Sequence, residues 1–474
     1  MPSKTYTIST RIEVTEEFKK YFSEYKTEYN RIYRIMWHKM TDPSYRTKYP
    51  KDSYFVTEIC QEYDLLKRTV NSLRYDIKGR MKSYQELKKT EQKQLQIKIA
   101  QKIRKIEEIC EKINRLKPLI TANKSTKKQL ETYRNLKKSL YWQKNKLNAM
   151  KQKEKQLEYE IKNQKYSLGF GSKQLFQKQN RLEENGYVIH LQWYQDYQNA
   201  RDKNIFYLGS SDETCGNQMF QMRYEEETKE FSVKIRKEKK YCKTNHPIEN
   251  YIQLEHLKFK HLQEELVGVV TSYEDSRKGS TPLSYRLVNK GKKWYFQVMF
   301  AIQYENYETF SSYGTVGLDY NDGFIELSET DACGNLIFQE HYPLLLHGTG
   351  KKAENEIRTT VATIVADAKR KGKDIVIEDL SFVKTKAKIT SAKGQKGKNY
   401  NRMLHAFDSS RYIFTIENAC HRNQVCLQKI NPWNTSKIGK QKYANHKKLN
   451  IHQAASYVIA RKGQGFVDLL QKAK

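Results

Sequence analysis

The sequence contains no long run of uncharged apolar residues. No window approaches the ~20 apolar residues that a membrane-spanning helix requires. The first segment, MPSKTYTISTRIEV, has no apolar stretch of the kind found in signal peptides. We therefore expect no signal peptide and no membrane partner.

The sequence has few cysteines, and their spacing suggests no pairs. The seven cysteines are odd in number and scattered, and none belongs to a CxxC pair. This pattern argues against a disulfide framework and against a zinc ribbon. We expect reduced thiols in a cytoplasmic protein, and no zinc.

Acidic residues are few relative to basic ones: Lys and Arg number 87, Asp and Glu 54, and the formal charge is +33. A chain of 474 residues with 38% hydrophobic residues is long enough for two or more domains, and its 34 tyrosines argue against full disorder. A folded, very basic protein favours the phosphate backbone of nucleic acid as its partner. An anionic membrane surface is the weaker alternative.

The positive charge is dense between Met81 and Lys165, where 24 basic and 9 acidic residues give a net charge of +15. Apolar residues recur there at helical spacing in two stretches, and we expect the first to end at Pro118. The pattern predicts an antiparallel helical hairpin. Its lysine face is either simply solvated, as on a coiled coil, or binds nucleic acid, and the size of the charge favours nucleic acid.

Strand-like sequence lies on both sides of this hairpin. Residues 6–14 alternate in polarity, and KWYFQVMF at 293–300 alternates after an Asn-Lys-Gly turn, which indicates a β-hairpin. Residues 18–40 are typical of an aromatic-rich helix. We predict a β-barrel-like domain that is interrupted by the helical insertion. The predicted divisions of the chain are 1–50, 51–168, 169–312 and 313–474.

The sequence of the last third of the chain predicts a different arrangement of strands and helices. Its expected elements, in order, are strands at 315–320, 324–329 and 335–341, a helix at 351–371, a strand at 374–380, a helix at 402–422, a strand at 424–431 and a helix from 451. Three strands in a meander followed by alternating helices and strands are the order of an RNase H-like layer. The expected fold class is therefore a multidomain combination of α/β and β.

Two acidic residues follow apolar strands, where burial makes a carboxylate costly unless it is paired or binds a metal. Asp319 follows VGL and Glu378 follows IVI. The first and fourth strands are neighbours in an RNase H-like sheet, so both carboxylates would meet at one edge, where they suit Mg²⁺ or Mn²⁺. Two such ions can activate a water and stabilise the leaving oxygen of a phosphodiester. The alternative is structural: Asp319 caps a turn and Glu378 pairs with a lysine.

Four motifs occur in order: GLDYND–FIELSETDACGN, IVIEDLSF, INPWNTSKIGKQKY and HQAASYVIARKGQGF. Together they resemble the RuvC-like nuclease half of the TnpB family. These are insertion-sequence-encoded, RNA-guided DNA nucleases related to type V CRISPR effectors. Upstream, FGSKQLFQKQN and FYLGSSDETCGNQ resemble a Lys-rich branch of that family.

The resemblance implies that Asp319 and Glu378 are catalytic metal ligands of a bacterial DNA endonuclease that uses Mg²⁺ or Mn²⁺. It also implies guide RNA and double-stranded target DNA as partners. Base pairing next to a short DNA motif would select the target, while the protein contacts mainly backbone and shape. A transposase encoded nearby would be a further partner, and the location would be the cytoplasm, at the nucleoid.

The chain departs from the family pattern at the third ligand. The family's third acid commonly opens the last helix in an Asp-x-Asn-Ala-Ala pattern, and the equivalent position here is Ile451. We assign His452 as the third catalytic and metal-binding residue, because a neutral imidazole can bind Mn²⁺ or orient a water. Alternatively, His452 only caps or packs the helix. Asn450 and Asp468 are weaker candidates.

A second departure is the missing cysteine quartet after the Thr435-Ser436 motif, which again predicts no zinc. We expect Thr435 and Ser436 to contact nucleic acid. A cationic segment also follows Glu378, and it is either a guide for a nucleic-acid strand or a solvated loop. Its basic residues are Lys384, Lys386, Lys388, Lys393, Lys396, Lys398 and Arg402.

Two other functions stay open. The altered third position allows a nuclease-deficient, RNA-guided DNA-binding protein, and the charge alone allows an RNA-binding protein that stabilises a transcript. Two costly acids in apolar strands favour the endonuclease.

Overall fold

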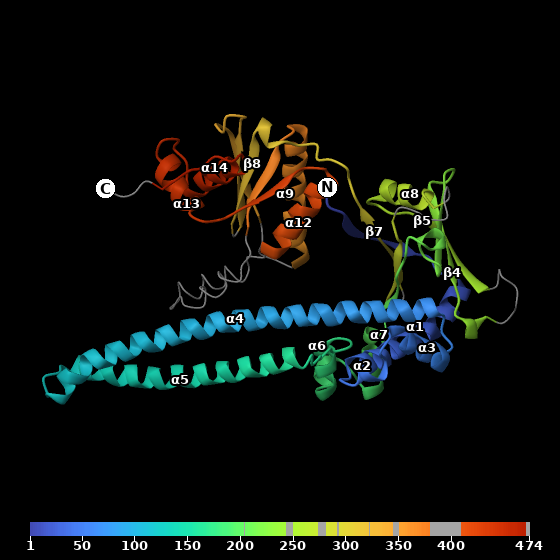
Figure 1. Cartoon of the computed structure of the whole chain (residues 1–474), viewed down its shortest axis with the longest axis horizontal. Helices are drawn as coiled ribbons and strands as arrows, with labels where there is room; N and C mark the ends of the chain where they lie inside the picture. The colour runs from blue at the N-terminus through green and yellow to red at the C-terminus, as the bar shows by residue number, and fades with distance from the viewer. Residues whose placement is uncertain are drawn as a thin grey trace. The chain divides into compact units, whose positions relative to one another are not determined.

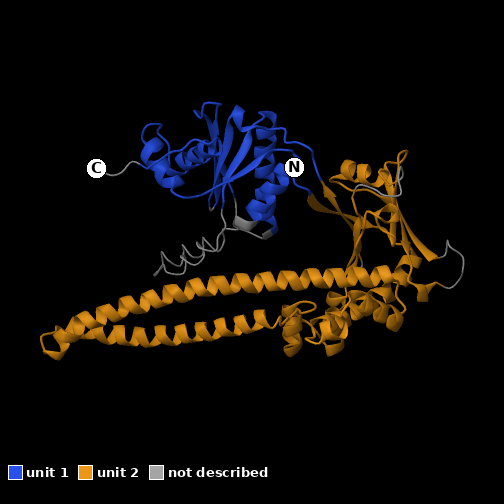
Figure 2. Cartoon of the chain, viewed as in Figure 1, with its two compact units in different colours: residues 1–3, 303–474 blue, residues 4–302 orange. Residues whose placement is uncertain are grey.

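The computed structural model describes residues 1–202, 204–242, 250–273, 281–291, 293–321, 323–344, 350–379 and 409–470. The chain forms two compact units, one of residues 1–3 and 303–474 and the other of residues 4–302 (Figure 2). Helices and three sheets are mixed, as predicted. All seven cysteines are free thiols. None of the described helices has the length and apolar character needed to cross a bilayer.

The unit of residues 4–302 contains a four-stranded sheet in the order β1-β7-β6-β2. β1 (Lys4–Ile12) pairs antiparallel with β7 (Lys293–Ile302), so a strand before the helical insertion pairs with a strand after it, as predicted. β6 (Ser284–Lys290) and β7 form the predicted hairpin. The two edge strands are β1 and β2 (Asn204–Tyr207).

A second sheet in this unit has the order β3-β4-β5. Its strands are β3 (Phe220–Glu225), β4 (Glu230–Arg236) and β5 (Tyr251–Leu257). No backbone pairing between described strands joins it to the first sheet, so the described strands of the predicted β-barrel-like domain form two sheets. The edge strand β2 has only four residues, which limits further pairing.

α1 (Glu16–Thr41) follows β1 and packs against the first sheet. It begins at Thr15, whose side chain accepts a hydrogen bond from the backbone of Phe18 at 3.2 Å. The rings of Phe18 and Phe22 lie 5.2 and 5.9 Å from that of Trp294 on β7. The aromatic stripe of this helix is therefore core. The shorter helices of the unit are α2 (Tyr45–Lys48), α3 (Asp52–Tyr63), α6 (Lys173–Gln177), α7 (His190–Arg201) and α8 (Gln263–Thr271).

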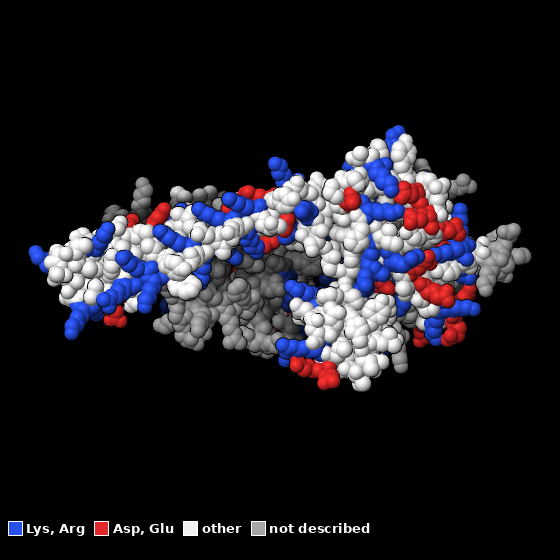
Figure 3. Space-filling model, turned by 90° about the horizontal axis from the view of Figure 1, so that it is seen from below, with Lys and Arg blue, Asp and Glu red and all other residues white. Residues whose placement is uncertain are grey.

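The basic segment forms the predicted antiparallel hairpin, which is drawn as two long helices in Figure 1. These are α4 (Lys67–Thr121) and α5 (Lys127–Lys162). Leu95, Ile99 and Leu157 are buried where the helices meet. Lys and Arg side chains are spread along the hairpin on the face seen in Figure 3.

The prediction that Pro118 ends the first helix of the hairpin is wrong. Pro118 lies in the last turn of α4, which continues to Thr121. Proline lacks an N–H and removes one bond to the preceding turn. Its carbonyl still accepts the N–H of Ala122 at 3.1 Å, so the last turn closes around it.

The other unit is built on a five-stranded sheet in the order β10-β9-β8-β11-β12. β8, β9 and β10 run antiparallel in succession, whereas β11 runs parallel to both β8 and β12. The first and fourth strands are therefore neighbours, as expected for an RNase H-like layer. The strands are β8 (Thr315–Asn321), β9 (Phe324–Thr330), β10 (Leu336–Pro343), β11 (Asp374–Glu378) and β12 (Leu427–Ile430).

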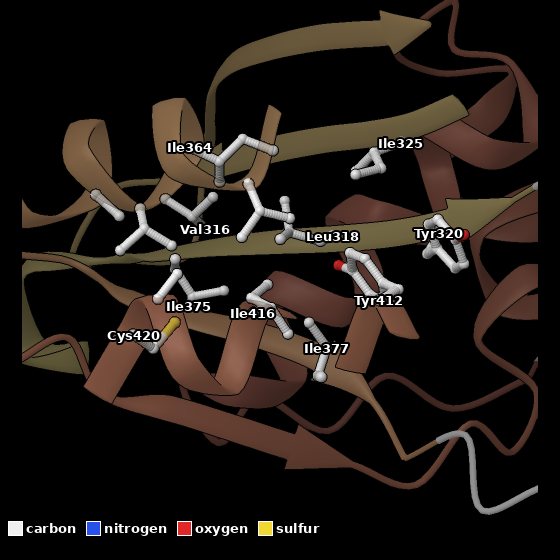
Figure 4. Packing of buried hydrophobic residues seen from close by; sticks show 14 of the residues in the cluster. Val316, Leu318, Tyr320, Ile325, Ile364, Ile375, Ile377, Tyr412, Ile416 and Cys420 are labelled. Carbon is white, nitrogen blue, oxygen red and sulfur yellow. The ribbon is translucent and has the colours of Figure 1, made fainter. Parts of the chain in front are cut away.

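Helices contribute to both faces of this sheet. α9 (Gly350–Arg370) and α12 (Ser409–Arg422) supply side chains to a buried cluster with Leu318 and Tyr320, whose ring stacks on that of Tyr412 at 4.0 Å (Figure 4). α14 (Ile451–Gly463) packs on the opposite face of β8, after the short helix α13 (Thr435–Ile438).

Candidate functional site

The site is built on the alternation of β8. Side chains along a strand point alternately to its two faces. Leu318 and Tyr320 therefore enter the buried cluster, whereas Gly317, Asp319 and Asn321 point to the face that α14 covers. The side chain of Asp319 is 13% exposed, so its carboxylate is shielded but accessible.

β11 brings the second predicted carboxylate to the same place. Ile377 pairs with Leu318 in the parallel ladder, and both side chains belong to the buried cluster. The next residue on each strand, Glu378 and Asp319, therefore points to the opposite face. Burial raises the pKa of Glu378, and the negative charge of Asp319 raises it further. The two carboxylates are close enough to repel each other.

Glu378 is held by a hydroxyl group. The hydroxyl of Thr435, at the start of α13, donates a hydrogen bond to Glu378 Oε1 and lowers the pKa of this carboxyl against the effect of burial. Lys462 on α14 lowers it slightly by its charge. Within the described residues, Glu378 forms no ion pair, so the structural alternative of a lysine partner is not observed.

His452 joins the site from the first turn of α14. Asn450 caps this helix in a capping box with Gln453. Nδ1 of His452 lies 3.1 Å from Oδ2 of Asp319, and this hydrogen bond raises the pKa of the imidazole, although partial burial opposes it. The ring also meets Phe324 edge-on at 5.2 Å. The histidine beside the position of the expected acid therefore contacts the first predicted ligand.

The two oxygens of Asp319 have different surroundings. Oδ2 accepts hydrogen bonds from Asn321 Nδ2 at 2.9 Å and from His452. Oδ1 has no hydrogen-bond partner in the part of the chain that the structure describes. One oxygen is thus fixed by the protein and the other is available to a ligand.

Glu326 is a third carboxyl at this position, and the sequence reading did not single it out. It lies directly opposite Asp319 in the β8–β9 ladder and is 2% exposed. Its Oε1 lies 2.9 Å from Nδ1 of His341, and its buried Oε2 has no hydrogen-bond partner among the described residues. The alternation of FIELSE, which puts Glu326 on the face of Ser328, was the signal that could have identified it.

The weaker candidates have structural roles. Asn450 is used as a helix cap. Asp468 accepts hydrogen bonds from Arg461 Nε at 2.9 Å and from the Tyr443 hydroxyl at 2.8 Å. Neither has a recorded hydrogen bond or ion pair with Asp319 or Glu378.

The predicted nucleic-acid contacts are only partly described. Thr435 is 2% exposed and its hydroxyl is used by Glu378, so its first role here is to hold that carboxylate. Ser436 is exposed. The basic residues predicted at 384–402 lie outside the described residues.

The donor chemistry of the site fits a divalent metal. Asp319 Oδ1 and the Glu378 carboxylate are hard oxygen ligands, and a cation between them would relieve their repulsion. Among the residues described, however, no group of three or more His, Cys, Asp or Glu side chains has the arrangement of a metal site. The metal therefore stays a prediction, with His452 directed at Asp319.

Comparisons with known proteins give distant likenesses. No protein-family model and no curated protein matches the chain. The RuvC of T. thermophilus in complex with a Holliday junction substrate is 13% identical, over 31% of this chain and 89% of that one, with a TM-score of 0.22. A CRISPR-Cas12f ternary complex is 14% identical, over 96% of this chain and 98% of that one, with a TM-score of 0.22. At these identities and TM-scores, the likenesses assign neither a family nor an activity.

Proposed function

We propose that this chain is an RNA-guided DNA endonuclease with a divalent-metal site in its RNase H-like unit. The observation that carries the proposal is the position of Asp319 and Glu378. They lie on the same face of two adjacent parallel strands, close enough for the charge of Asp319 to raise the pKa of Glu378. Partly buried carboxylates that repel each other are costly to a fold unless they serve a cation.

The residues at this site have different roles. Asp319 Oδ1 and Glu378 hold the metal, while Thr435 fixes the orientation of Glu378. Asn321 and His452 hold Oδ2 of Asp319 and so set the direction of its other oxygen. When bound, Mg²⁺ or Mn²⁺ lowers the pKa of a water and stabilises the leaving oxygen of a phosphodiester.

Guidance by RNA rests on the sequence motifs and on the charge. The four ordered motifs resemble the TnpB family, and the formal charge of +33 suits a large phosphate surface. Base pairing between guide and target would supply the sequence selectivity, with the protein contacting backbone and shape.

Plasmid cleavage tests the proposal. Purified protein–RNA complex is incubated with matched or unmatched plasmid and Mg²⁺ or Mn²⁺, and Asp319→Ala and Glu378→Gln are the controls. We expect cleavage of the matched plasmid alone, and a rate at least ~10²-fold lower in either variant. Wild-type cleavage that persists in both variants would remove the proposed site.

A nuclease-deficient, RNA-guided DNA-binding protein is the second candidate. It is favoured by Ile451 at the position where the family commonly has an acid and by the lack of a three-residue metal cluster in the described part. This candidate predicts guide-dependent binding of matched DNA without cleavage by the wild type in either metal. Purification of the protein without any associated RNA would argue against both candidates.

A further inference from the structure

A cavity of about 250 Å³ lies within the unit of residues 4–302. Its walls come from α1, α4, α7, β2, β6 and the segment 169–172 that precedes α6. Three arginines line it, namely Arg80, Arg201 and Arg286, and Asp76 is the one acid among its described lining residues. The cavity is therefore positively charged.

Asp76, the single acidic residue of the described lining, already accepts hydrogen bonds from two neighbours. Asp76 Oδ2 accepts a hydrogen bond from the Tyr33 hydroxyl at 2.7 Å and one from Arg80 Nε at 2.9 Å. Neither Arg201 nor Arg286 forms an ion pair with any residue that the structure describes. These two arginines leave the cavity with uncompensated positive charge.

Both uncompensated arginines are held by aromatic rings. The guanidinium of Arg201 lies 5.3 Å from the centre of the Tyr197 ring, and that of Arg286 lies 5.4 Å from the centre of the Phe206 ring. Stacking fixes the plane of a guanidinium and leaves its N–H edge available to an acceptor. Arg201 Nε is buried and has no hydrogen-bond partner within the described part of the chain. A buried donor in this state calls for an acceptor.

The segment over Arg201 requires glycine. Gly171 has φ +92°, and a Cβ there would lie 3.0 Å from Arg201 Cγ and 3.3 Å from Tyr197 Cε2. A larger residue would therefore displace the stacked pair. The close approach of this backbone, the stacked guanidiniums and the buried donor together form a preorganised site.

We propose that this cavity binds one phosphate of a nucleic-acid strand together with its attached sugar, and that Arg201 and Arg286 hold the phosphate. Planar guanidiniums match phosphate oxygens with paired, charge-assisted hydrogen bonds. The volume corresponds to roughly eight waters, more than one phosphate ion occupies, which leaves room for the sugar. A strand is the favoured source because the chain carries a formal charge of +33. This proposal does not depend on cleavage.

Salt-dependent binding tests it. Arg201→Gln and Arg286→Gln remove the charge and keep a polar side chain. Arg181→Gln is the matched control, because Arg181 is 72% exposed and lies outside the cavity lining. Full-length wild type and variants are titrated with labelled single-stranded RNA and DNA of one sequence at several salt concentrations.

We expect each cavity variant to weaken binding and to reduce the slope of log K against log salt by about 0.7, the value for one single-strand phosphate contact. The control should keep the wild-type slope. A salt slope that is lower in the cavity variants than in the wild type, for RNA alone, for DNA alone or for both, supports the proposal and identifies the strand. Unchanged slopes in both cavity variants would overturn it, and circular dichroism of each variant verifies that it is folded.

A second measurement separates a strand from a free nucleotide. Adenosine monophosphate and inorganic phosphate are each added to the wild type and to Arg201→Gln during thermal unfolding. Stabilisation of the wild type alone by the mononucleotide, with unchanged oligonucleotide slopes, would assign the cavity to a free nucleotide and overturn the proposal. If Arg201→Gln is no longer stabilised by the mononucleotide and also has a reduced salt slope for oligonucleotide binding, the result supports the proposal.

Discussion

The contact between Thr435 and Glu378 illustrates how one hydroxyl can set the state of a carboxylate. Burial and the charge of Asp319 both favour the protonated form of Glu378, and the hydrogen bond from Thr435 opposes them. A metal requires the ionised form. Thr435 therefore acts on metal affinity through Glu378 and not by contact with the metal.

Thr435→Val tests this role because valine has the same shape without the hydroxyl. We expect the pKa of Glu378 to rise further and the affinity for Mn²⁺ to fall about 10–100-fold. Isothermal titration with Mn²⁺ measures the change. Ser436→Ala alters the exposed neighbour and should leave the affinity unchanged. Equal affinities in the wild type and Thr435→Val would exclude the role.

The hydrogen bond between His452 and Asp319 gives stability that depends on pH. The folded-state pKa of His452 is raised, so this stability is fully present below the unfolded-state pKa of about 6.5 and is lost as the pH rises through the folded-state value. Because the His452 side chain is 47% exposed, solvent screening limits the effect to about 1 kcal/mol or less.

Thermal unfolding of wild type and His452→Gln between pH 5 and 9, with chelator present, measures this contribution. We expect the wild type to be more stable near pH 5.5 by up to ~2–4 °C and the difference to shrink above pH 7. In an Asp319→Asn background the pH dependence of the difference should become smaller, and the charge of Glu326 accounts for what remains. A difference that is constant with pH would show that His452 contributes packing alone.

The sequence predicted much of this site but not all of it. Asp319 and Glu378 could be found because an acid in an apolar strand is conspicuous, and His452 because it lies beside the expected acid. Glu326 was missed because its strand, FIELSE, is already half polar. The meander predicts that 324–329 pairs with 315–320, but which residue lies opposite Asp319 depends on the register of that pairing, which a local pattern does not fix.

At the scale of elements, the site depends on how closely α14 approaches β8. Gly317 allows this approach: a Cβ at this position would lie 2.3 Å from the carbonyl oxygen of Ser456 and 2.4 Å from the backbone nitrogen of Ala460. The same helix carries His452, so the spacing between helix and strand also sets the contact with Asp319.

Gly317→Ala should force α14 away from the strand. We expect a loss of about 1–3 kcal/mol in the free energy of unfolding, measured by denaturant titration, and weaker Mn²⁺ binding. Gly268→Ala is the matched control, because Gly268 lies in α8 and has no atom within 4 Å of the added Cβ. Alanine there should be neutral or stabilise by up to ~1 kcal/mol. Full stability in Gly317→Ala would contradict the close packing.

Most helices and strands could be predicted from the periodicity of their apolar residues, and the departures have physical causes. The strands of the last third and the hairpin helices were predicted because their apolar residues repeat with clear periods. Proline usually breaks helices and Pro118 therefore predicts a stop, yet in the last turn only one backbone hydrogen bond is lost. Closure of the β strands into a barrel could not be judged, because edge pairing is a tertiary property.

At the scale of the whole molecule, charge and chemistry are carried by different units. The carboxylate site lies in the unit of residues 303–474, whereas the segment 81–165, with its net charge of +15, belongs to residues 4–302. Binding and cleavage should therefore be separable by mutation.

Replacing four exposed hairpin lysines with glutamine, at Lys137, Lys138, Lys144 and Lys146, tests this separation. We expect weaker binding of a guide–target duplex and a salt slope reduced by about 0.9 for each lysine that meets a phosphate. Cleavage at saturating duplex should be retained. The control removes four exposed lysines outside the hairpin, at Lys20, Lys51, Lys229 and Lys260. An equal loss of duplex binding in the two sets of variants would show that binding depends only on the total charge of the protein.

The alternation of β8 also couples folding to chemistry. Leu318 anchors the core while its neighbour Asp319 faces the opposite side, so inserting or deleting one residue within this strand would exchange the two roles. The apolar side chains would then be exposed to water and the carboxylate would be buried in the core. Relatives of this chain could vary at single positions of the strand, but a length change inside it would remove the fold and the site together.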